Sequence, residues 1–242
     1  MNILRSVCLM TVLLFSHVHA GPPFKTDDPQ PVDYRHWEIY AASAQQFGRF
    51  ETAATFPHFE VNYGVVPEVQ LHIVVPFEYV HANEGNAYGL SDLELGVKYR
   101  FLEESESFPQ IGIFPLVELP TGYNTRHLGS GQTQVFLPVW VQKSWGRLTT
   151  YGGGGYWINP GPGQRNWVFA GWQAQYDFSE LVTIGAELYY QGADAENAEV
   201  TGGLSFGGFI NVSEHSHILF SCGRTVSGDA FTTGYLGFQL TI

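Results

Sequence analysis

The amino-acid sequence predicts an all-β protein, an antiparallel up-and-down transmembrane β-barrel of about 12 strands. Three observations lead to this prediction: apolar and polar side chains alternate along many segments, the segments are long, and the connections between them alternate in length. The clear segments have about 9–11 alternating residues, a length that crosses a bilayer when a strand is tilted. A row of apolar side chains on strand after strand would be a large sticky patch on a soluble protein, whereas lipid requires it.

The first 20 residues are predicted to be a secretory signal peptide, 1–20. Arg5 precedes an apolar run from Val7 to Phe15, and Val18-His19-Ala20 has the small-x-small pattern of a cleavage site. The mature chain keeps a single cysteine, Cys222, so we expect no internal disulfide.

Composition narrows the class of protein. Charged residues make up only 14% of the chain and aromatic residues 15%, whereas an ordinary soluble domain has roughly 25% charged residues. The whole chain has a net charge of -12, and its 11 Lys and Arg residues do not provide the clustered positive charge that binds phosphates. We therefore expect no nucleic-acid partner. No cofactor is expected either, because the run Gly152–Gly155 lacks the Lys-Ser/Thr that follows in a phosphate-binding loop.

Residues 21–34 are expected to form an extended periplasmic N-terminal segment. Pro23 and Pro29 flank Asp27 and Asp28 and limit regular structure there. The sequence leaves three arrangements open for this segment. It could tuck into the mouth of the barrel, contact a partner or remain a disordered terminus.

The barrel is expected to span 35–242. Alternation is clearest in the segment that contains Leu71, Ile73 and Val75 on one face, because side chains along a strand point to opposite faces in turn. Eight segments show the pattern strongly: 69–79, 92–101, 111–119, 132–142, 167–176, 182–191, 200–212 and 235–242. Four weaker segments complete the set: 35–46, 57–64, 147–158 and 216–226. The glycines of the third weak segment obscure which of its residues face outward.

The connections are predicted to separate the two rims of the barrel. The short connections are 65–67, 103–107, 144–146, 177–180 and 213–216. The longer ones, rich in Gly and Asn, are 47–56, 81–89, 121–131, 159–166 and 192–199, whereas 227–229 breaks the alternation. Short periplasmic turns opposite longer outer loops are typical of outer-membrane barrels. Aromatic residues near the strand ends are expected to form an interface girdle: Trp37, Tyr63, Tyr79, Tyr99, Trp145, Trp157, Tyr176 and Tyr190.

Three motifs resemble a known family. They are Gly-Pro-Pro-Phe-Lys-Thr-Asp-Asp-Pro at 21–29, which leads through Trp37 into the first strand, Tyr-Gly-Leu-Ser-Asp at 88–92 and Glu-Leu-Pro-Thr-Gly at 118–122. Together they resemble a family of bacterial outer-membrane barrels that is labelled for the meta-pathway of phenol degradation and often described as transporters. The resemblance covers essentially the whole mature chain. It implies a barrel in the cell outer membrane that moves hydrophobic or aromatic small molecules, and it offers no catalytic residues to carry over.

The polar faces of the strands are expected to line the interior of the barrel. The lumen-lining candidates are His72, Glu78, Asp92, Glu94, Lys98, Arg100, Glu118, Gln134, Trp140, Trp167, Phe169 and Glu187. The charged members could form an electrostatic lining that selects a solute, or a salt-bridge network that plugs a narrow barrel. The aromatic members could form a greasy route for a ligand, or could simply fill the interior.

The expected function is a passive channel for small hydrophobic or aromatic solutes, acting as a monomer among outer-membrane lipids. Two alternatives stay open: an outer-membrane lipid-acting enzyme or lipid-binding barrel, and a closed barrel with a structural or surface-binding role. The enzyme is disfavoured because no histidine accompanies a serine in a Gly-x-Ser-x-Gly setting. A metal site is not expected, because His215 and His217 lack an identifiable third ligand.

Overall fold

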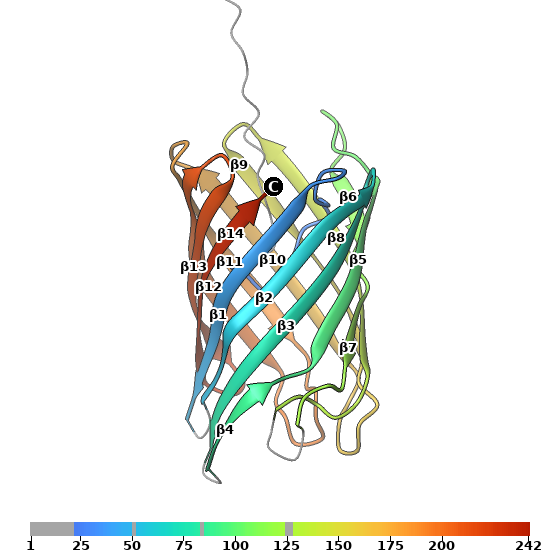
Figure 1. Ribbon diagram of the computed structural model, residues 1–242, viewed down its shortest axis with the longest axis vertical. Helices are drawn as coiled ribbons and strands as arrows, with labels where there is room; N and C mark the ends of the chain where they lie inside the picture. The colour runs from blue at the N-terminus through green and yellow to red at the C-terminus, as the bar shows by residue number, and fades with distance from the viewer. Residues whose placement is uncertain (1–21, 50–51, 83–84, 124–127) are drawn as a thin grey trace, which may run out of the picture.

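The chain forms a closed antiparallel β-barrel in a computed structural model, which describes residues 22–49, 52–82, 85–123 and 128–242 (Figure 1). The predicted signal peptide, 1–20, lies outside the described residues. The strands are β1 (Trp37–Gly48), β2 (Thr52–Val66), β3 (Val69–Ala82), β4 (Gly85–Leu90), β5 (Leu93–Leu102), β6 (Gln110–Ile113), β7 (Leu116–Leu119), β8 (Gln134–Trp145), β9 (Leu148–Ile158), β10 (Trp167–Asp177), β11 (Val182–Gln191), β12 (Thr201–Ser213), β13 (Ser216–Ser227) and β14 (Phe231–Thr241).

These 14 segments make 12 strands around the barrel, because two of the strands are interrupted. β3 pairs with both β4 and β5, which are the two halves of one strand. β6 and β7 both lie between β5 and β8 and form another strand, interrupted at Phe114 and Pro115. β1 pairs with β14 in a register that sets Glu38 opposite Thr241, and this pairing closes the sheet. The predicted number of strands is therefore confirmed.

The two rims of the barrel differ. The turn end carries the start of β1, the end of β14 and the connections that follow β2, β5, β8, β10 and β12. The opposite rim, here the loop end, carries the other connections, the longest of which are 120–133, 159–166 and 192–200 (Figure 1).

The predictions for two of the long connections were wrong. Residues 47–56 and 81–89 were expected to be loops, but most of them continue the strands. Phe47 pairs with Thr52 across β1 and β2, and His81 pairs with Asn86 across β3 and β4. Gly and Asn near a hairpin mark the turn itself, and they do not prevent the flanking residues from forming ladder hydrogen bonds.

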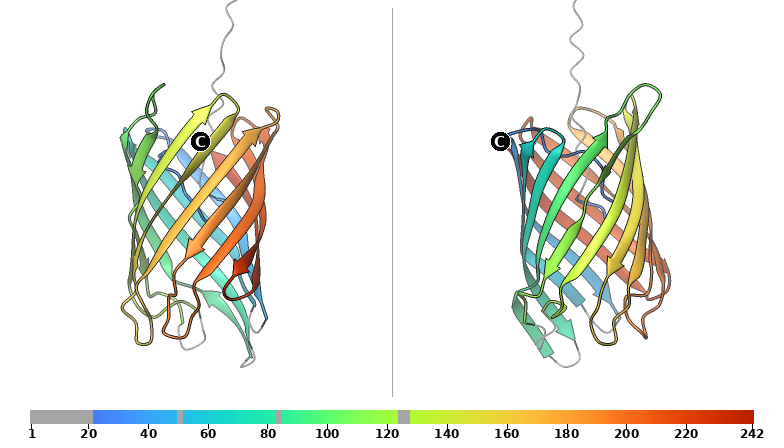
Figure 2. Two further views of the ribbon diagram at one scale, coloured as in Figure 1. Left: turned by 180° about the vertical axis from the view of Figure 1, so that it is seen from behind. Right: turned by 90° about the vertical axis from the view of Figure 1, so that its right-hand side faces the viewer.

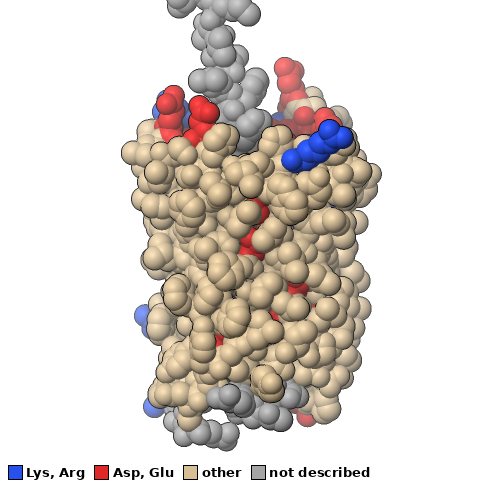
Figure 3. All heavy atoms as spheres, in the orientation of Figure 1, with Lys and Arg blue, Asp and Glu red and all other residues tan. Residues whose placement is uncertain are grey.

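The barrel is apolar outside and polar inside. On β10, Trp172 points outward and is 53% exposed, while the adjacent Gln173 is fully buried. On β11, Leu188 is 66% exposed and the adjacent Glu187 only 1%. The face in Figure 3 is mostly tan, and charged side chains are prominent at its turn-end rim. No helix in the described part of the chain is long and apolar enough to cross a membrane.

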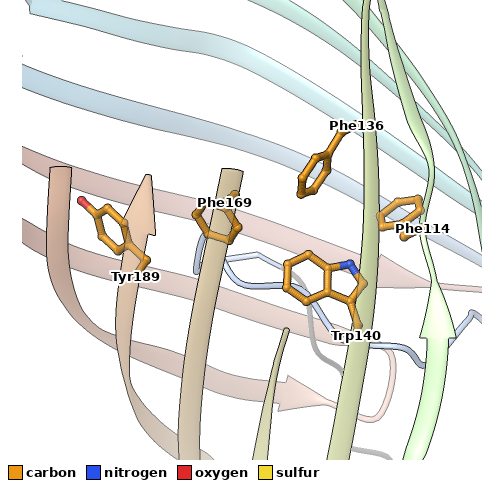
Figure 4. Packing of buried hydrophobic residues seen from close by; sticks show 5 residues of the cluster. All are labelled: Phe114, Phe136, Trp140, Phe169 and Tyr189. Atoms are coloured by element: carbon orange, nitrogen blue, oxygen red, sulfur yellow. The ribbon is translucent and has the colours of Figure 1, made fainter. Parts of the chain in front are cut away.

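Aromatic rings fill one side of the interior. The cluster contains Phe114, Phe136, Trp140, Phe169 and Tyr189, all of which are buried (Figure 4). Glycines of β9 make room for these rings, because a Cβ on Gly153 would come within 3.0 Å of the Trp140 ring and within 2.1 Å of the Val139 carbonyl oxygen. Gly153 also has a φ of 149°, which L side chains rarely adopt.

We predict that Gly153→Ala destabilises the folded barrel. The added methyl group collides with the backbone of β8 and with the Trp140 ring, and overpacking of this kind typically costs about 1–3 kcal/mol. Urea unfolding in detergent micelles, followed by tryptophan fluorescence, measures the change. Gly146→Ala is the matched control, because Gly146 also has a positive φ but a Cβ there meets nothing within 4 Å. Equal losses in the two variants would contradict the proposed collision.

Candidate functional site

The N-terminal segment lies inside the barrel. We call residues 22–33 the N-terminal plug; Figure 2 shows this blue segment crossing the interior. Thr26 and Asp28 of the plug have no exposed surface. Of the arrangements left open by the sequence, insertion into the barrel is the one that the structure shows. The position of this segment on the periplasmic side stays a prediction.

Three hydrogen bonds made by backbone groups of the plug join it to three different strands. They are Ser221 Oγ to Pro23 O at 2.6 Å (β13), Thr26 N to Glu187 Oε1 (β11), and Val32 N to Gln70 Oε1 at 2.9 Å (β3). These contacts provide partners for backbone groups that have no ladder of their own, and buried backbone groups need such partners. The plug is therefore bonded to opposite sides of the barrel wall.

Lys98 of β5 forms the central ion pair between the wall and the plug. Its Nζ lies 2.9 Å from Asp27 Oδ1 and 3.6 Å from Asp28 Oδ2, and Lys98 is only 3% exposed. Burial raises the pKa of the Asp28 carboxyl, and the Lys98 ammonium opposes that rise. A charge so deeply buried requires a partner, and the plug provides two.

A large cavity lies on the loop-end side of the plug. This chamber has a volume of about 730 Å³, and its lining includes Phe24 and Lys25 of the plug. Five of the predicted residues also line it: His72, Glu78, Asp92, Glu94 and Glu118. The other predicted residues lie elsewhere in the barrel.

Protein groups already bind most of the carboxylates in the chamber wall. Asp92 accepts hydrogen bonds from Gly122 N at 3.0 Å, Ser130 N at 2.6 Å and Ser130 Oγ at 2.8 Å. Glu78 accepts one from Ser91 Oγ at 2.7 Å. These two carboxylates therefore help to shape the loop end of the chamber.

His72 links strands β2, β3 and β5. Its Nδ1 lies 2.7 Å from Asn62 Oδ1, and its Nε2 lies 2.9 Å from Glu94 Oε1. The His72 side chain therefore bonds to a residue of each strand beside β3. Glu94 in turn is directly opposite Glu118 on β7.

The predicted aromatic residues pack against one another and do not line the chamber. Trp140 and Phe169 are 2% and 6% exposed within the aromatic cluster, and their ring centroids are 6.3 Å apart. Trp167 packs against this cluster and stacks on Trp157, with 5.5 Å between the centroids. Their role in solute passage stays a prediction.

Trp157 was wrongly placed in the interface girdle. Its ring stacks inside the barrel on Phe136 at 4.8 Å. The glycines Gly152–Gly155 hid the alternation that would have shown its direction, because they carry no side chain to mark a face.

The remaining predicted residues are spread over the barrel wall, and two of them bind the plug. Glu187 binds the plug, as described above, and Lys98 binds it on the other side. Arg100 forms an ion pair with Glu68 near the turn end and donates from Nη1 to Gln110 Oε1 at 2.9 Å. Gln134 lies opposite Glu118 in the β7–β8 ladder.

Many residues of the chamber wall were not among the predicted candidates, and two of them are titratable residues of β2. His58 and Glu60 lie on β2, and Glu60 is 6% exposed and accepts a hydrogen bond from Asn62 Nδ2 at 2.8 Å. The two residues are two positions apart on β2, so they lie on the same face of the strand. This spacing was the signal in the sequence that could have identified them together. Within the described ranges, no group of three or more His, Cys, Asp or Glu residues could hold a metal ion.

Comparisons with known proteins show the fold. No family model matches the chain, and no curated protein matches it. An outer membrane channel from Pseudomonas putida F1 superposes with a TM-score of 0.75 at 15% identity, covering 89% of this chain and 98% of that one. The KdgM porin in complex with disordered oligogalacturonate gives 0.56 at 12% identity, covering 84% and 98% of the two chains. The CymD monoaromatic hydrocarbon channel gives 0.51 at 8% identity, covering 86% and 89%.

We predict that Lys98→Met releases the plug from the wall. The substitution leaves the carboxylates of Asp27 and Asp28 without their cation, and breaking a buried pair costs about 3–5 kcal/mol. Limited proteolysis of the folded protein, read by mass spectrometry, should then show cleavage within residues 22–33. Lys143→Met is the control, because Lys143 pairs with Glu104 away from the plug. Equal protection of the plug in wild type and Lys98→Met would show that the ion pair does not hold it.

Proposed function

We propose that the protein is a passive channel in the cell outer membrane for small hydrophobic or aromatic solutes. The architecture supports this proposal: the closed sheet contains a large chamber, and known channels share the fold. One of these channels, CymD, is described as a channel for monoaromatic hydrocarbons. We further propose that the protein works as a monomer, since each barrel closes on its own.

The outer face supports the membrane location. Leu188, Leu236 and Trp172 are each more than half exposed on that face. In water these residues would expose a large apolar surface, whereas the hydrocarbon of a bilayer solvates it. The short turns at the end that carries the start of β1 and the end of β14 match the periplasmic rim of bacterial barrels.

The chamber is the observation that best supports the proposed class of solute. Its volume of about 730 Å³ lies within the range of roughly 300–1,000 Å³ that is usual for small-molecule sites. Its lining combines Phe24, Phe114 and Leu116 with carboxylates, most of which already have protein partners. The apolar side chains in this mixed wall favour hydrophobic solutes, and the carboxylates disfavour an acidic sugar such as the oligogalacturonate of the KdgM complex.

We predict that the protein accelerates uptake of labelled toluene by intact Gram-negative cells, and that Ala44→Trp reduces this uptake. Ala44 lines the chamber on β1, so an indole at this position fills the space that the solute needs. Ala41→Trp is the matched control, because Ala41 lies on the outward face of the same strand. Uptake is measured over seconds against cells that carry the empty vector.

Two results would contradict the proposal. The first is toluene uptake that equals the empty-vector rate although the folded barrel is present in the outer membrane. The second is equal uptake in the Ala44→Trp and Ala41→Trp variants, which would show that solutes do not use the chamber.

A further inference from the structure

A second, smaller cavity lies on the other side of the plug. It has a volume of about 70 Å³ and is lined by the plug and by residues of β1, β2, β3, β5 and β14. It reaches the turn end of the barrel at His36 and Thr241. The chamber, by contrast, reaches the loop end at Gln46 and Ser130. Between them the two cavities extend toward both rims of the barrel.

The two cavities share four lining residues, which we call the neck: Pro22, Asp27, Glu60 and Phe114. Pro22 and Asp27 belong to the plug, whereas Glu60 lies on β2 and Phe114 lies between β6 and β7. Because the same side chains line both cavities, the neck is only one layer of side chains thick. Joining the two cavities would require a displacement at these residues.

The opposite flank of the plug is closely packed around Thr26. A Cβ added to Gly171 of β10 would come within 2.0 Å of Thr26 Oγ1. Glu187 of β11, which bonds Thr26 N, is 1% exposed. None of these residues lines either cavity. The small cavity that meets the chamber at the neck lies on the other flank of the plug, which faces β1, β2, β3 and β5.

The ion pair at the neck can open without stranding a charge. Lys98 contacts both Asp27 and Asp28, and the side chain of Asp27 is 22% exposed whereas that of Asp28 is fully buried. When the Asp27 side chain swings into the chamber, its carboxylate meets water and Asp28 remains next to the ammonium group. This movement removes one of the four neck side chains and leaves the rest of the plug bound.

We propose that solutes pass the plug through the neck, along the flank that faces β1, β2, β3 and β5, while the plug stays in the barrel. The inference rests on the proposed channel function, and it assigns the rate-determining constriction to the four residues of the neck. Expulsion of the plug is not required. The chemistry of the neck, one ring and two carboxylates, admits neutral solutes of small cross-section and disfavours anions.

A covalent tether tests the proposal. Thr26→Cys with Gly171→Cys, in a Cys222→Ser background, places two cysteines where a Cβ on Gly171 lies 3.2 Å from the Thr26 Cβ. Disulfides need roughly 3.5–4.5 Å between Cβ atoms, so a small backbone shift allows the bond. The tether holds the plug on the flank away from the neck, and mass spectrometry verifies that it has formed.

The oxidised, tethered protein should keep most of its toluene uptake in cells and of its K⁺ conductance in planar bilayers. Phe114→Leu in the tethered protein should raise the K⁺ conductance about twofold or more, because it widens the constriction of the pore. Phe169→Leu is the matched control; it shortens a buried ring that lines neither cavity and should leave the conductance unchanged. Heat-dependent gel migration checks that each variant is folded.

The outcomes separate the route from the function. Loss of uptake and conductance on oxidation, with recovery on reduction, would show that the plug must leave, and would overturn the route while the channel stands. K⁺ conductance through the tethered protein without toluene uptake would overturn the solute class and support the route. Equal conductance in the Phe114→Leu and Phe169→Leu variants would overturn the assignment of the constriction to the neck. The absence of any conductance in the tethered protein would overturn it as well.

Discussion

The whole structure depends on the closure of one sheet whose apolar side chains point outward. Closure gives each strand two hydrogen-bonded neighbours, and it directs the alternate side chains into an interior that they must fill. Glu187 and Leu188 show the result within two residues, since the first is buried inside and the second exposed outside. A barrel of this kind buries polar groups, and each of them requires a partner.

The N-terminal plug is one answer to that requirement. In a barrel without the plug, Lys98 would lose the carboxylates of Asp27 and Asp28, and Gln70 and Glu187 would lose the backbone donors that the plug supplies. The plug also divides the interior into a chamber at the loop end and a small cavity near the turn end. The same contacts that satisfy the wall therefore set the volume available to a solute.

Much of the fold could be predicted from the sequence because alternation is a local signal. The segment 182–191 was predicted as a strand from its own residues, and β11 has the same bounds. The position of the plug could not be predicted in this way, because Thr26 and Glu187 are 161 residues apart in the chain. Proline content indicates an extended segment, but it does not indicate which wall that segment meets.

The candidate site was predicted only in part, because it too depends on contacts between residues far apart in the chain. Parity along a strand separates inward from outward side chains, so Glu94 and Glu118 could be named, and Trp157 was misplaced where glycines removed the signal. Parity does not say which inward residues surround an open space. That depends on the packing of rings such as Trp140 and Phe169 on one side of the interior, and on the course of the plug.

The most direct test of the account is tryptophan quenching by brominated acyl chains, because it asks what solvates the outer face. Two variants of the mature protein are needed in lipid vesicles, one that keeps only Trp172 and one that keeps only Trp140. Trp172 is 53% exposed on the outer face and Trp140 is 2% exposed inside. If hydrocarbon solvates the outer face, Trp172 should be strongly quenched and Trp140 should be quenched little. Quenching of Trp172 by aqueous iodide, with none by the brominated chains, would contradict this expectation.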